Sequence, residues 1–356
     1  MSKVLIKGNE AIAEAAIQAG CRFFFGYPIT PQNEIPEYMA YRMPQVGGCF
    51  LQAESELAAI NMVYGASGAG ARVMTSSSSP GISLKQEGIS FMATVQLPCV
   101  VVNMVRGGPG LGSIQPSQGD YFQATKGGGH GDYHVFVLAP ASVQEAADMV
   151  MEGFDIADQY RIPVMILGDG MIGQMMEPVE FKVPPKRDLP EKTWASTGWR
   201  DQAARPRSII NSLYITGNDL EQINLALQEK YAEITANEVR WEEYECEGAE
   251  IIVAAYGTVA RIMRNVIALA KKEGIRVGLI RPKTLWPFPA QIYAQAAQWD
   301  SVRSFLCVEM SAGQMVEDVR LAVGGIKPVH FYGRLGGAIP EPSEILSEIK
   351  KIREGE

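Results

Sequence analysis

Glu56 opens a stretch of small side chains and could serve as a buried hydrogen-bonding carboxylate. It follows the apolar run 49–51, and residues 58–70 are rich in Ala, Gly and Ser. A glutamate in a first helical turn can simply balance the helix dipole. Alternatively, a carboxyl group in an apolar pocket can hydrogen-bond a ligand nitrogen. The small side chains favour close approach of a ligand or of another subunit.

Arg106 is the only cation in a glycine-rich segment that follows an apolar run. Four glycines lie within residues 107–112, which suggests a loop whose backbone approaches another group closely or moves. An arginine there can bind a carboxylate or phosphate through two parallel hydrogen bonds. The alternative is an ordinary surface arginine in a flexible loop.

Two further polar segments follow apolar runs. Tyr27-Pro28-Ile29-Thr30-Pro31 comes directly after Phe23-Phe24-Phe25, and Thr30 adds a hydroxyl. Ser76-Ser77-Ser78-Ser79 precedes Pro80 and would place hydroxyls and backbone N–H groups at a helix N-terminus, where anions bind. A rigid turn and a solvent-exposed loop are the respective structural alternatives.

The sequence predicts no metal site in this chain. Gly168-Asp169-Gly170 matches the start of the magnesium–diphosphate signature of thiamine enzymes, but residues 193–200, where its closing asparagine belongs, contain none. We therefore interpret the tripeptide as a structural turn. The five cysteines are isolated from one another in the sequence, which argues against an iron–sulfur or zinc site and predicts buried free thiols.

Short apolar runs alternate with helical stretches up to about residue 185. This pattern predicts a doubly wound α/β domain over residues 1–185. Residues 186–246 read as an irregular arm followed by an amphipathic helix, for which Asn218-Asp219 is a plausible cap and which either spaces two domains or lies along one. A second α/β pattern predicts a domain over residues 247–356, and the carboxyl edges of the strands are where such domains bind ligands.

Composition excludes several classes of function. The net charge of −8 offers no basic surface for nucleic acid or for an anionic membrane. No run of residues is apolar enough for a membrane span or a signal peptide. We expect a cytoplasmic protein.

Taken together, these segments resemble the alpha subunit of the 2-oxoacid:ferredoxin oxidoreductases over nearly the whole chain. The second domain resembles the carboxyl-terminal domain of the transketolase superfamily. The motifs that carry the resemblance are Tyr27-Pro28-Ile29-Thr30-Pro31, Ser55-Glu56, Ser79-Pro80-Gly81-Ile82-Ser83-Leu84 and Val105-Arg106-Gly107-Gly108-Pro109.

The resemblance implies a thiamine diphosphate site shared between subunits. Glu56 would hydrogen-bond a pyrimidine nitrogen, Thr30 would contact substrate, and Arg106 would lie near the 2-oxoacid carboxylate. Tyr27, Pro28, Ile29 and Ser79 would complete the cofactor contacts. A beta subunit would bind the diphosphate and Mg²⁺.

The resemblance also implies a multi-subunit enzyme of anaerobic metabolism that is inactive as this chain alone. Iron–sulfur clusters would lie only in partner subunits, among them a small cysteine-rich, ferredoxin-like subunit. A gamma subunit would complete the complex. Coenzyme A would take the acyl group, and external ferredoxin would take the electrons.

The loop after Arg106 bears on the substrate. Members of the family that act on 2-oxoglutarate commonly carry a basic residue there, whereas residues 110–120 of this chain contain no cation. Since an unpaired second carboxylate is costly to bury, we expect an aliphatic substrate of the 2-oxoisovalerate, or branched-chain, type. A 2-oxoglutarate-specific alpha subunit and a non-catalytic scaffold subunit remain alternatives. A dinucleotide-dependent dehydrogenase is disfavoured, because no glycine fingerprint follows residues 4–6.

Overall fold

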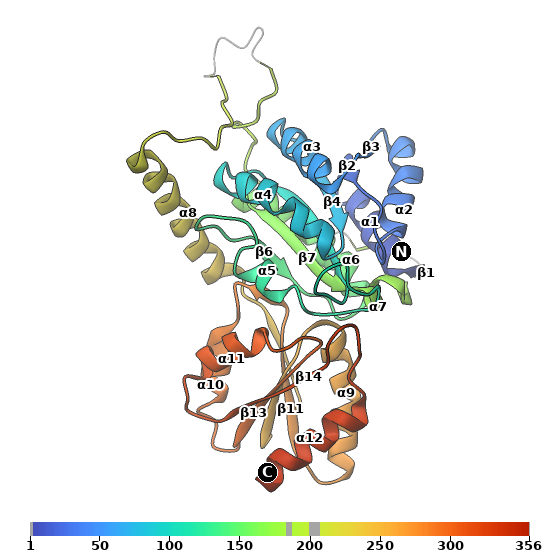
Figure 1. Cartoon of the computed structure of the whole chain (residues 1–356), viewed down its shortest axis with the longest axis vertical. Helices are drawn as coiled ribbons and strands as arrows, with labels where there is room; N and C mark the ends of the chain where they lie inside the picture. Colours follow the sequence, from blue (N-terminus) through green and yellow to red (C-terminus); the bar gives the residue numbers. More distant parts are fainter. Residues whose placement is uncertain (1–2, 183–186, 199–206, 356) are drawn as a thin grey trace.

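The computed structural model describes residues 3–182, 187–198 and 207–355. Two α/β units, each built around its own mainly parallel sheet, lie one above the other along the long axis of the molecule (Figure 1). The fold class predicted from the sequence is confirmed.

The first unit contains a seven-stranded sheet whose central strands are buried on both faces. Its order is β12-β6-β7-β5-β4-β2-β3, and every pairing is parallel except that of β12 with β6. Continuous apolar runs make such strands because helices cover both faces of the sheet. The strands are β2 (Phe23–Gly26), β3 (Cys49–Gln52), β4 (Val73–Ser77), β5 (Cys99–Val105), β6 (Phe136–Leu138), β7 (Pro163–Asp169) and β12 (Thr284–Trp286).

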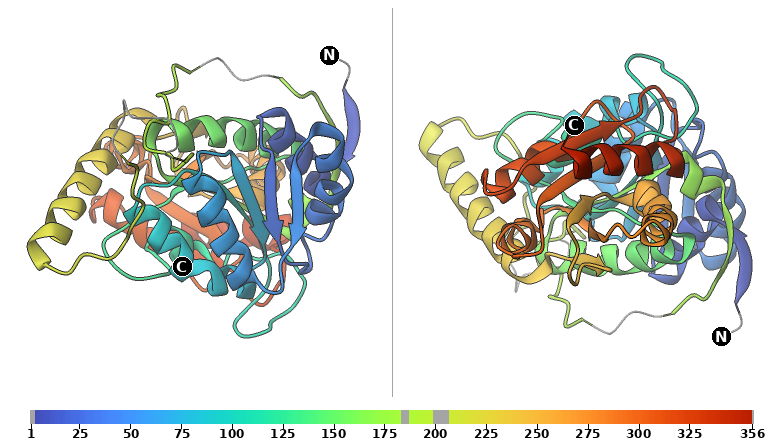
Figure 2. Two further views of the ribbon diagram at one scale, coloured as in Figure 1. Left: turned by 90° about the horizontal axis from the view of Figure 1, so that it is seen from above. Right: turned by 90° about the horizontal axis from the view of Figure 1, so that it is seen from below.

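Helices cover the two faces of this sheet in a doubly wound arrangement. One apolar core joins the sheet to α3 (Glu56–Gly68) and α4 (Pro80–Thr94). A second core joins the opposite face to α1 (Gly8–Gln18), α2 (Glu34–Arg42) and α6 (Val143–Tyr160). Figure 2 shows α6 on one side of the sheet and α3 and α4 on the other. Shorter elements are the 3-10 helix η1 (Met43–Val46), α5 (Tyr121–Thr125) and α7 (Gly170–Gln174).

The second unit has the strand order β14-β13-β10-β11-β9, with β9 antiparallel at one edge. One face packs on α9 and α12, and the other packs on α10 and α11. The elements are β9 (Trp241–Tyr244), β10 (Ile251–Ala254), α9 (Gly257–Lys272), β11 (Val277–Pro282), α10 (Ala290–Ala296), β13 (Ser304–Glu309), α11 (Met315–Val323), β14 (Val329–Gly333) and α12 (Pro342–Glu354).

Two strands cross the boundaries that the sequence predicts. β9 precedes residue 247 but pairs with β11 of the second sheet, whereas β12 follows it and pairs with β6 of the first sheet. Trp286 of β12 stacks on His134 with the ring centroids 4.4 Å apart, and this contact holds β12 at the edge of the first sheet. The division at residues 185/186 and 246/247 therefore stays a prediction.

The amphipathic helix is α8 (Gly217–Glu238), and it lies along the first unit (Figure 1). Its buried Leu227, Tyr231 and Ile234 belong to the core that α6 shares. The predicted cap is wrong: Thr216 caps the helix by accepting a hydrogen bond of 3.3 Å from Asp219 N. The predicted irregular arm lies partly outside the described residues.

The N-terminal strand belongs to neither main sheet. β1 (Val4–Lys7) pairs antiparallel with β8 (Met176–Val179) as a separate two-stranded ribbon. Among the described residues, no helix combines the length and the apolar character that crossing a membrane requires.

Candidate functional site

The segments singled out by their chemistry meet at one edge of the first sheet. β5, β4, β2 and β3 are consecutive parallel neighbours, so the residues that follow them share the carboxyl edge. Thr30 follows β2, Glu56 begins the helix after β3, Ser79 follows β4 and Arg106 follows β5. This is the edge at which α/β sheets bind ligands.

Glu56 lies at the first position of α3 with little solvent exposure. Ser55 caps the helix by accepting a hydrogen bond of 3.2 Å from Ala58 N, while the Glu56 residue is 6% exposed. A Cβ added to Gly81 would lie 2.5 Å from Glu56 Oε1, so the carboxylate rests directly against the start of α4. Within the described part of the chain, its oxygens make no hydrogen bond. The carboxylate is therefore available to a ligand.

The serines that follow β4 differ in their hydrogen bonding. Ser79 is committed to the protein: its Oγ accepts from Arg106 N at 3.1 Å and donates to Arg106 O at 3.2 Å. By contrast, Ser77 Oγ and Ser78 Oγ are buried and have no partner among the described residues. Buried hydroxyls are normally satisfied, so Ser77 and Ser78 are open to hydrogen bonding with a bound group, while the cofactor contact of Ser79 stays a prediction.

Arg106 is 7% exposed and ties two loops together. Its Nη1 donates to Thr30 O and its Nη2 donates to Leu111 O, each at 2.9 Å. Its Nε is buried without a partner among the described residues. The structure thus brings Arg106 and Thr30 into direct contact, although through the threonine carbonyl. The Thr30 hydroxyl accepts a hydrogen bond of 3.4 Å from Asn33 Nδ2.

The loop of Tyr27, Pro28 and Ile29 forms the outer part of the site. Tyr27 and Pro28 are exposed, and Ile29 is half-buried. Gln32, which the sequence analysis missed, holds this loop down: its Nε2 donates to Tyr27 O at 3.2 Å, and its Oε1 accepts from Ser76 Oγ. Its position directly after Pro31 was the only available signal.

Lys85 was also missed and is fully buried beneath the site. Its Nζ donates to Thr75 Oγ1 at 2.5 Å and to Ser76 O at 3.1 Å. Burial lowers the pKa of Lys85 to about 7, and the nearby Glu56 charge offsets part of this effect. The signal was its place between Ile82 and Ile89 on the apolar stripe of α4, where a lysine is unexpected.

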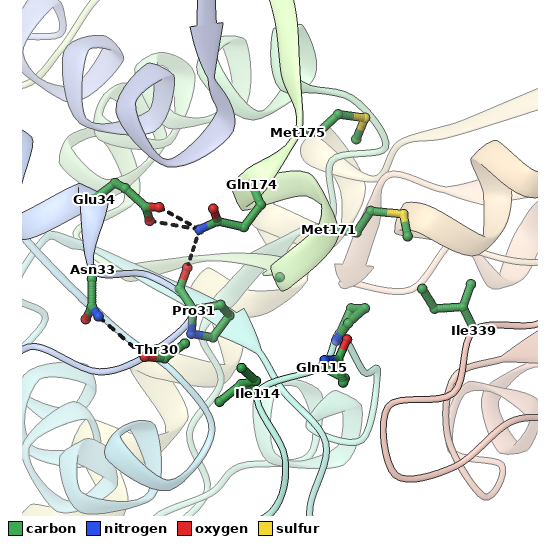
Figure 3. A pocket seen from close by; sticks show the side chains of 12 residues that line it. Thr30, Pro31, Asn33, Glu34, Ile114, Gln115, Met171, Gln174, Met175 and Ile339 are labelled. Carbon is green, nitrogen blue, oxygen red and sulfur yellow. Dashed lines mark hydrogen bonds between the residues drawn. The ribbon is translucent and has the colours of Figure 1, made fainter.

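A cavity of about 700 Å³ lies between the two units, and Thr30 forms part of its lining (Figure 3). Its apolar lining includes Ile114, Met171 and Ile339, and neither Lys nor Arg is among the described residues that line it. Glu34 brings a carboxylate, whose pKa burial would raise but hydrogen bonds from Asn9 and Gln174 hold below its ordinary value. Glu56 and Arg106 are not part of its lining.

Asp169 of the Gly168-Asp169-Gly170 turn serves the protein itself. Its Oδ1 accepts from Met171 N at 2.9 Å and from Ile172 N at 3.2 Å, which caps α7. Across the described ranges, no group of three or more His, Cys, Asp or Glu side chains could hold a metal ion.

The cysteines are free thiols. Burial raises the pKa of Cys21 and of Cys99 to about 12, so these two are unreactive. Cys49 is exposed, which corrects the expectation that all five are buried.

Family comparisons cover both units. Residues 14–244 match the thiamine diphosphate-binding region of pyruvate flavodoxin/ferredoxin oxidoreductase, and residues 249–345 match core domain II of pyruvate:ferredoxin oxidoreductase. Ketoisovalerate oxidoreductase subunit VorB of Methanothermobacter thermautotrophicus is 49% identical over 99% of this chain and 98% of its own. 2-Oxoglutarate synthase subunit KorA of the same organism is 36% identical over 98% of each chain.

Solved structures agree with the observed fold. A 2-oxoglutarate:ferredoxin oxidoreductase from Magnetococcus marinus superposes with a TM-score of 0.86 at 27% identity, over 98% of this chain. This chain spans only 65% of the length of that one. A split-gene transketolase matches in fold alone, with a TM-score of 0.61 at 14% identity over 97% of each chain.

Proposed function

Because the chain belongs to the pyruvate flavodoxin/ferredoxin oxidoreductase family, we propose that it forms the pyrimidine side of a shared thiamine diphosphate site in a 2-oxoacid:ferredoxin oxidoreductase. The observation that carries the proposal is the buried Glu56 carboxylate, which lies against Gly81 with no hydrogen bond among the described residues.

The residues at this edge fit the pyrimidine ring. Glu56 offers an oxygen to a ring nitrogen, and Ser77 and Ser78 offer buried hydroxyls without partners in the described part of the chain. Tyr27, Pro28 and Ile29 supply an outer wall. When bound, thiamine diphosphate supplies a carbon nucleophile for 2-oxoacids. This chain's task is to bind and orient the ring, to share a proton between Glu56 and a ring nitrogen, and to place Thr30 and Arg106 near the substrate.

An apolar rim around Glu56 supports a site completed by a partner. We define the rim as the exposed Leu51, Leu57, Leu84 and Leu111, which lie on segments at or just after the carboxyl ends of β3, β4 and β5. Exposed apolar side chains gathered at one edge mark interaction surfaces. A beta subunit that docks here would bring the residues that bind the diphosphate and Mg²⁺. Asp169 of this chain is not offered for that role, because its carboxylate caps α7.

The remaining partners follow from the family. A small cysteine-rich, ferredoxin-like subunit would carry the iron–sulfur clusters, and a gamma subunit would complete the complex. Coenzyme A would accept the acyl group and external ferredoxin the electrons.

For the substrate, we propose a branched-chain 2-oxoacid of the 2-oxoisovalerate type. The cavity beside Thr30 is lined by Ile114, Met171 and Ile339, includes the Glu34 carboxylate, and has no Lys or Arg among the lining residues that the structure describes. Glu34 already pairs with Lys7 Nζ at 3.4 Å, so a second carboxylate on the substrate would find no cationic partner among the described residues that line the cavity. The alternative, 2-oxoglutarate, is favoured only by the KorA relatives and by the Magnetococcus structure.

The test is activity of the complex reconstituted with its partner subunits. Glu56→Gln should lower the rate by about 10²–10⁴, the usual effect of losing a proton-transfer group. The isolated chain should contain no iron and oxidise no 2-oxoacid. An unchanged rate in Glu56→Gln would favour the non-catalytic scaffold.

A further inference from the structure

Asn33 lies between Thr30 and the start of α2, and the proposed function leaves its side chain without a role. Asparagine is a common helix-capping residue, yet the side chain of Asn33 makes no capping hydrogen bond to α2. Its backbone is already helical, with φ −55° and ψ −33°, whereas a capping residue usually has an extended backbone. Helix capping therefore does not explain the asparagine at this position.

The Asn33 amide contacts the Thr30 hydroxyl instead. Its Nδ2 donates a hydrogen bond of 3.4 Å to Thr30 Oγ1, and both side chains belong to the wall of the cavity between the two units (Figure 3). Asn33 Oδ1 is buried and has no partner among the described residues. The contact with Thr30 is thus the hydrogen bond that sets the direction of the amide.

This contact determines what the Thr30 hydroxyl can offer to a ligand. A threonine hydroxyl has one proton to donate and two lone pairs that accept. Because an amide nitrogen accepts no hydrogen bond, the hydroxyl accepts from Asn33 and its own proton points elsewhere. Across the described ranges no protein acceptor takes that proton. Arg106 Nη1 holds the Thr30 carbonyl at 2.9 Å, so the backbone of Thr30 is fixed while its hydroxyl proton is available to an acceptor in the cavity.

We propose that Asn33 is a positioning residue: by donating to Thr30 Oγ1, its amide directs the Thr30 hydroxyl proton toward an oxygen of a 2-oxoacid bound in the cavity. The inference rests on the substrate contact proposed for Thr30 and adds the group that controls the direction of that contact. An amide suits this task because it is a neutral donor that does not titrate. A carboxylate in the same place would accept the hydroxyl proton and withdraw it from the substrate.

The test replaces Asn33 in the complex reconstituted with its partner subunits. Asn33→Asp keeps the size of the side chain but turns the donor into an acceptor, so kcat/KM for 2-oxoisovalerate should fall by about 10- to 100-fold, the usual effect of losing one hydrogen bond to a charged group. Asn33→Ser removes the donor without adding a competing carboxylate and should lose less. Asn, Asp and Ser are equally suited to the start of a helix, so urea unfolding of both variants should match that of the native chain.

A pH profile distinguishes the direction of the proton from a change in structure. As the pH falls, the introduced carboxyl group takes up a proton and can again donate to Thr30, so kcat/KM of Asn33→Asp relative to the native complex should recover. Among the described residues that line the cavity, Glu34 is the ionisable group beside this position. It is common to both complexes, and Arg106 keeps its charge throughout. Asn237→Asp, exposed near the C-terminal end of α8, adds the same charge elsewhere and should keep a native profile.

A double-mutant cycle separates this inference from the proposed function. If Asn33 acts through the Thr30 hydroxyl, Asn33→Asp should cost little further kcat/KM once Thr30→Val has removed that hydroxyl. Equal losses in the native and the Thr30→Val backgrounds, or a native kcat/KM in Asn33→Asp, would overturn the role of Asn33 while the loss in Thr30→Val still supports the substrate contact. A native kcat/KM in Thr30→Val would instead reject the contact proposed for Thr30.

Discussion

Arg106 Nη1 donates a hydrogen bond of 2.9 Å to the Thr30 carbonyl oxygen, while its Nη2 donates to Leu111 O. One guanidinium therefore fixes the loop after β2 relative to the glycine-rich loop after β5. The arginine has a structural task that is independent of any contact with substrate.

Replacing Arg106 with Lys should separate the two loops, because a single ammonium cannot span both carbonyls in this geometry. Loss of one hydrogen bond from a charged donor should cost about 1.5–3 kcal/mol in the free energy of unfolding. The reconstituted enzyme should also lose kcat/KM. Denaturant unfolding and steady-state kinetics measure the two effects.

The matched control is Arg276→Lys. Arg276 pairs with Glu250 on the surface of the second unit, and its side chain is 62% exposed. Exposed pairs contribute little, so this variant should match the native protein in both assays. Equal behaviour of the Arg106 and Arg276 variants would refute the loop-fixing role.

Much of the fold could be predicted because it depends on local patterns. The strands of the first unit are short apolar runs followed by turn residues, and α8 has apolar side chains at helical spacing. β12 could not be predicted, because residues 284–286 pair with β6, nearly 150 residues earlier in the sequence. Only the docking of the two units creates that strand.

The candidate site was predictable as a set of residues but not in its contacts. Parallel strand order brings Thr30, Glu56 and Arg106 to one edge, as their positions after apolar runs suggested. Which serines are occupied depends on side-chain directions: Ser79 bonds to the Arg106 backbone, whereas Ser77 and Ser78 do not. The burial of Lys85 likewise depends on how α4 packs against α3.

Gly81→Ala should damage the site by steric conflict. The new methyl group would lie 2.1 Å from Ser77 Oγ and 2.5 Å from Glu56 Oε1, so the carboxylate must move. Affinity of the complex for thiamine diphosphate should fall by about tenfold or more, equivalent to about 1.4 kcal/mol. Gly65→Ala on α3 is the control, since its Cβ meets nothing within 4 Å, and it should bind normally. Native affinity in Gly81→Ala would contradict this geometry.

Stability should depend on pH through Lys85. The folded-state pKa of about 7 lies below the ordinary lysine pKa of 10.5, so the unfolded chain binds more protons between these values. The free energy of unfolding therefore gains a contribution that rises with pH across this window, by at most about 1.4 kcal/mol per pH unit. Lys85→Met should remove that rise. Urea unfolding at pH 7 and pH 9 for both proteins measures it, and identical pH slopes would contradict the prediction.

Gln115→Lys should shift substrate preference. Gln115 lines the cavity beside Thr30 (Figure 3), and an ammonium there would pair with the distal carboxylate of 2-oxoglutarate. Specificity, as the ratio of kcat/KM for 2-oxoglutarate to that for 2-oxoisovalerate, should rise by about 10–200-fold. Gln18→Lys adds the same charge at the exposed C-terminal residue of α1 and should leave the ratio unchanged. A native enzyme that already prefers 2-oxoglutarate would overturn the proposed substrate.

Leu84→Glu should prevent assembly with the beta subunit if the apolar rim around Glu56 is the docking surface. Leu84 is exposed on the first half of α4, so the isolated chain should fold and unfold as the native chain does. In the complex, the added carboxylate would be buried against an apolar surface without a partner. Affinity for the beta subunit should fall by about a hundredfold, equal to about 2.8 kcal/mol. Leu321→Glu changes a leucine that is also exposed, but on α11 of the second unit, and should bind as the native chain does. Analytical ultracentrifugation of each variant with the beta subunit distinguishes the outcomes: weakened binding in the Leu321 variant alone would move the interface from the first unit to the second.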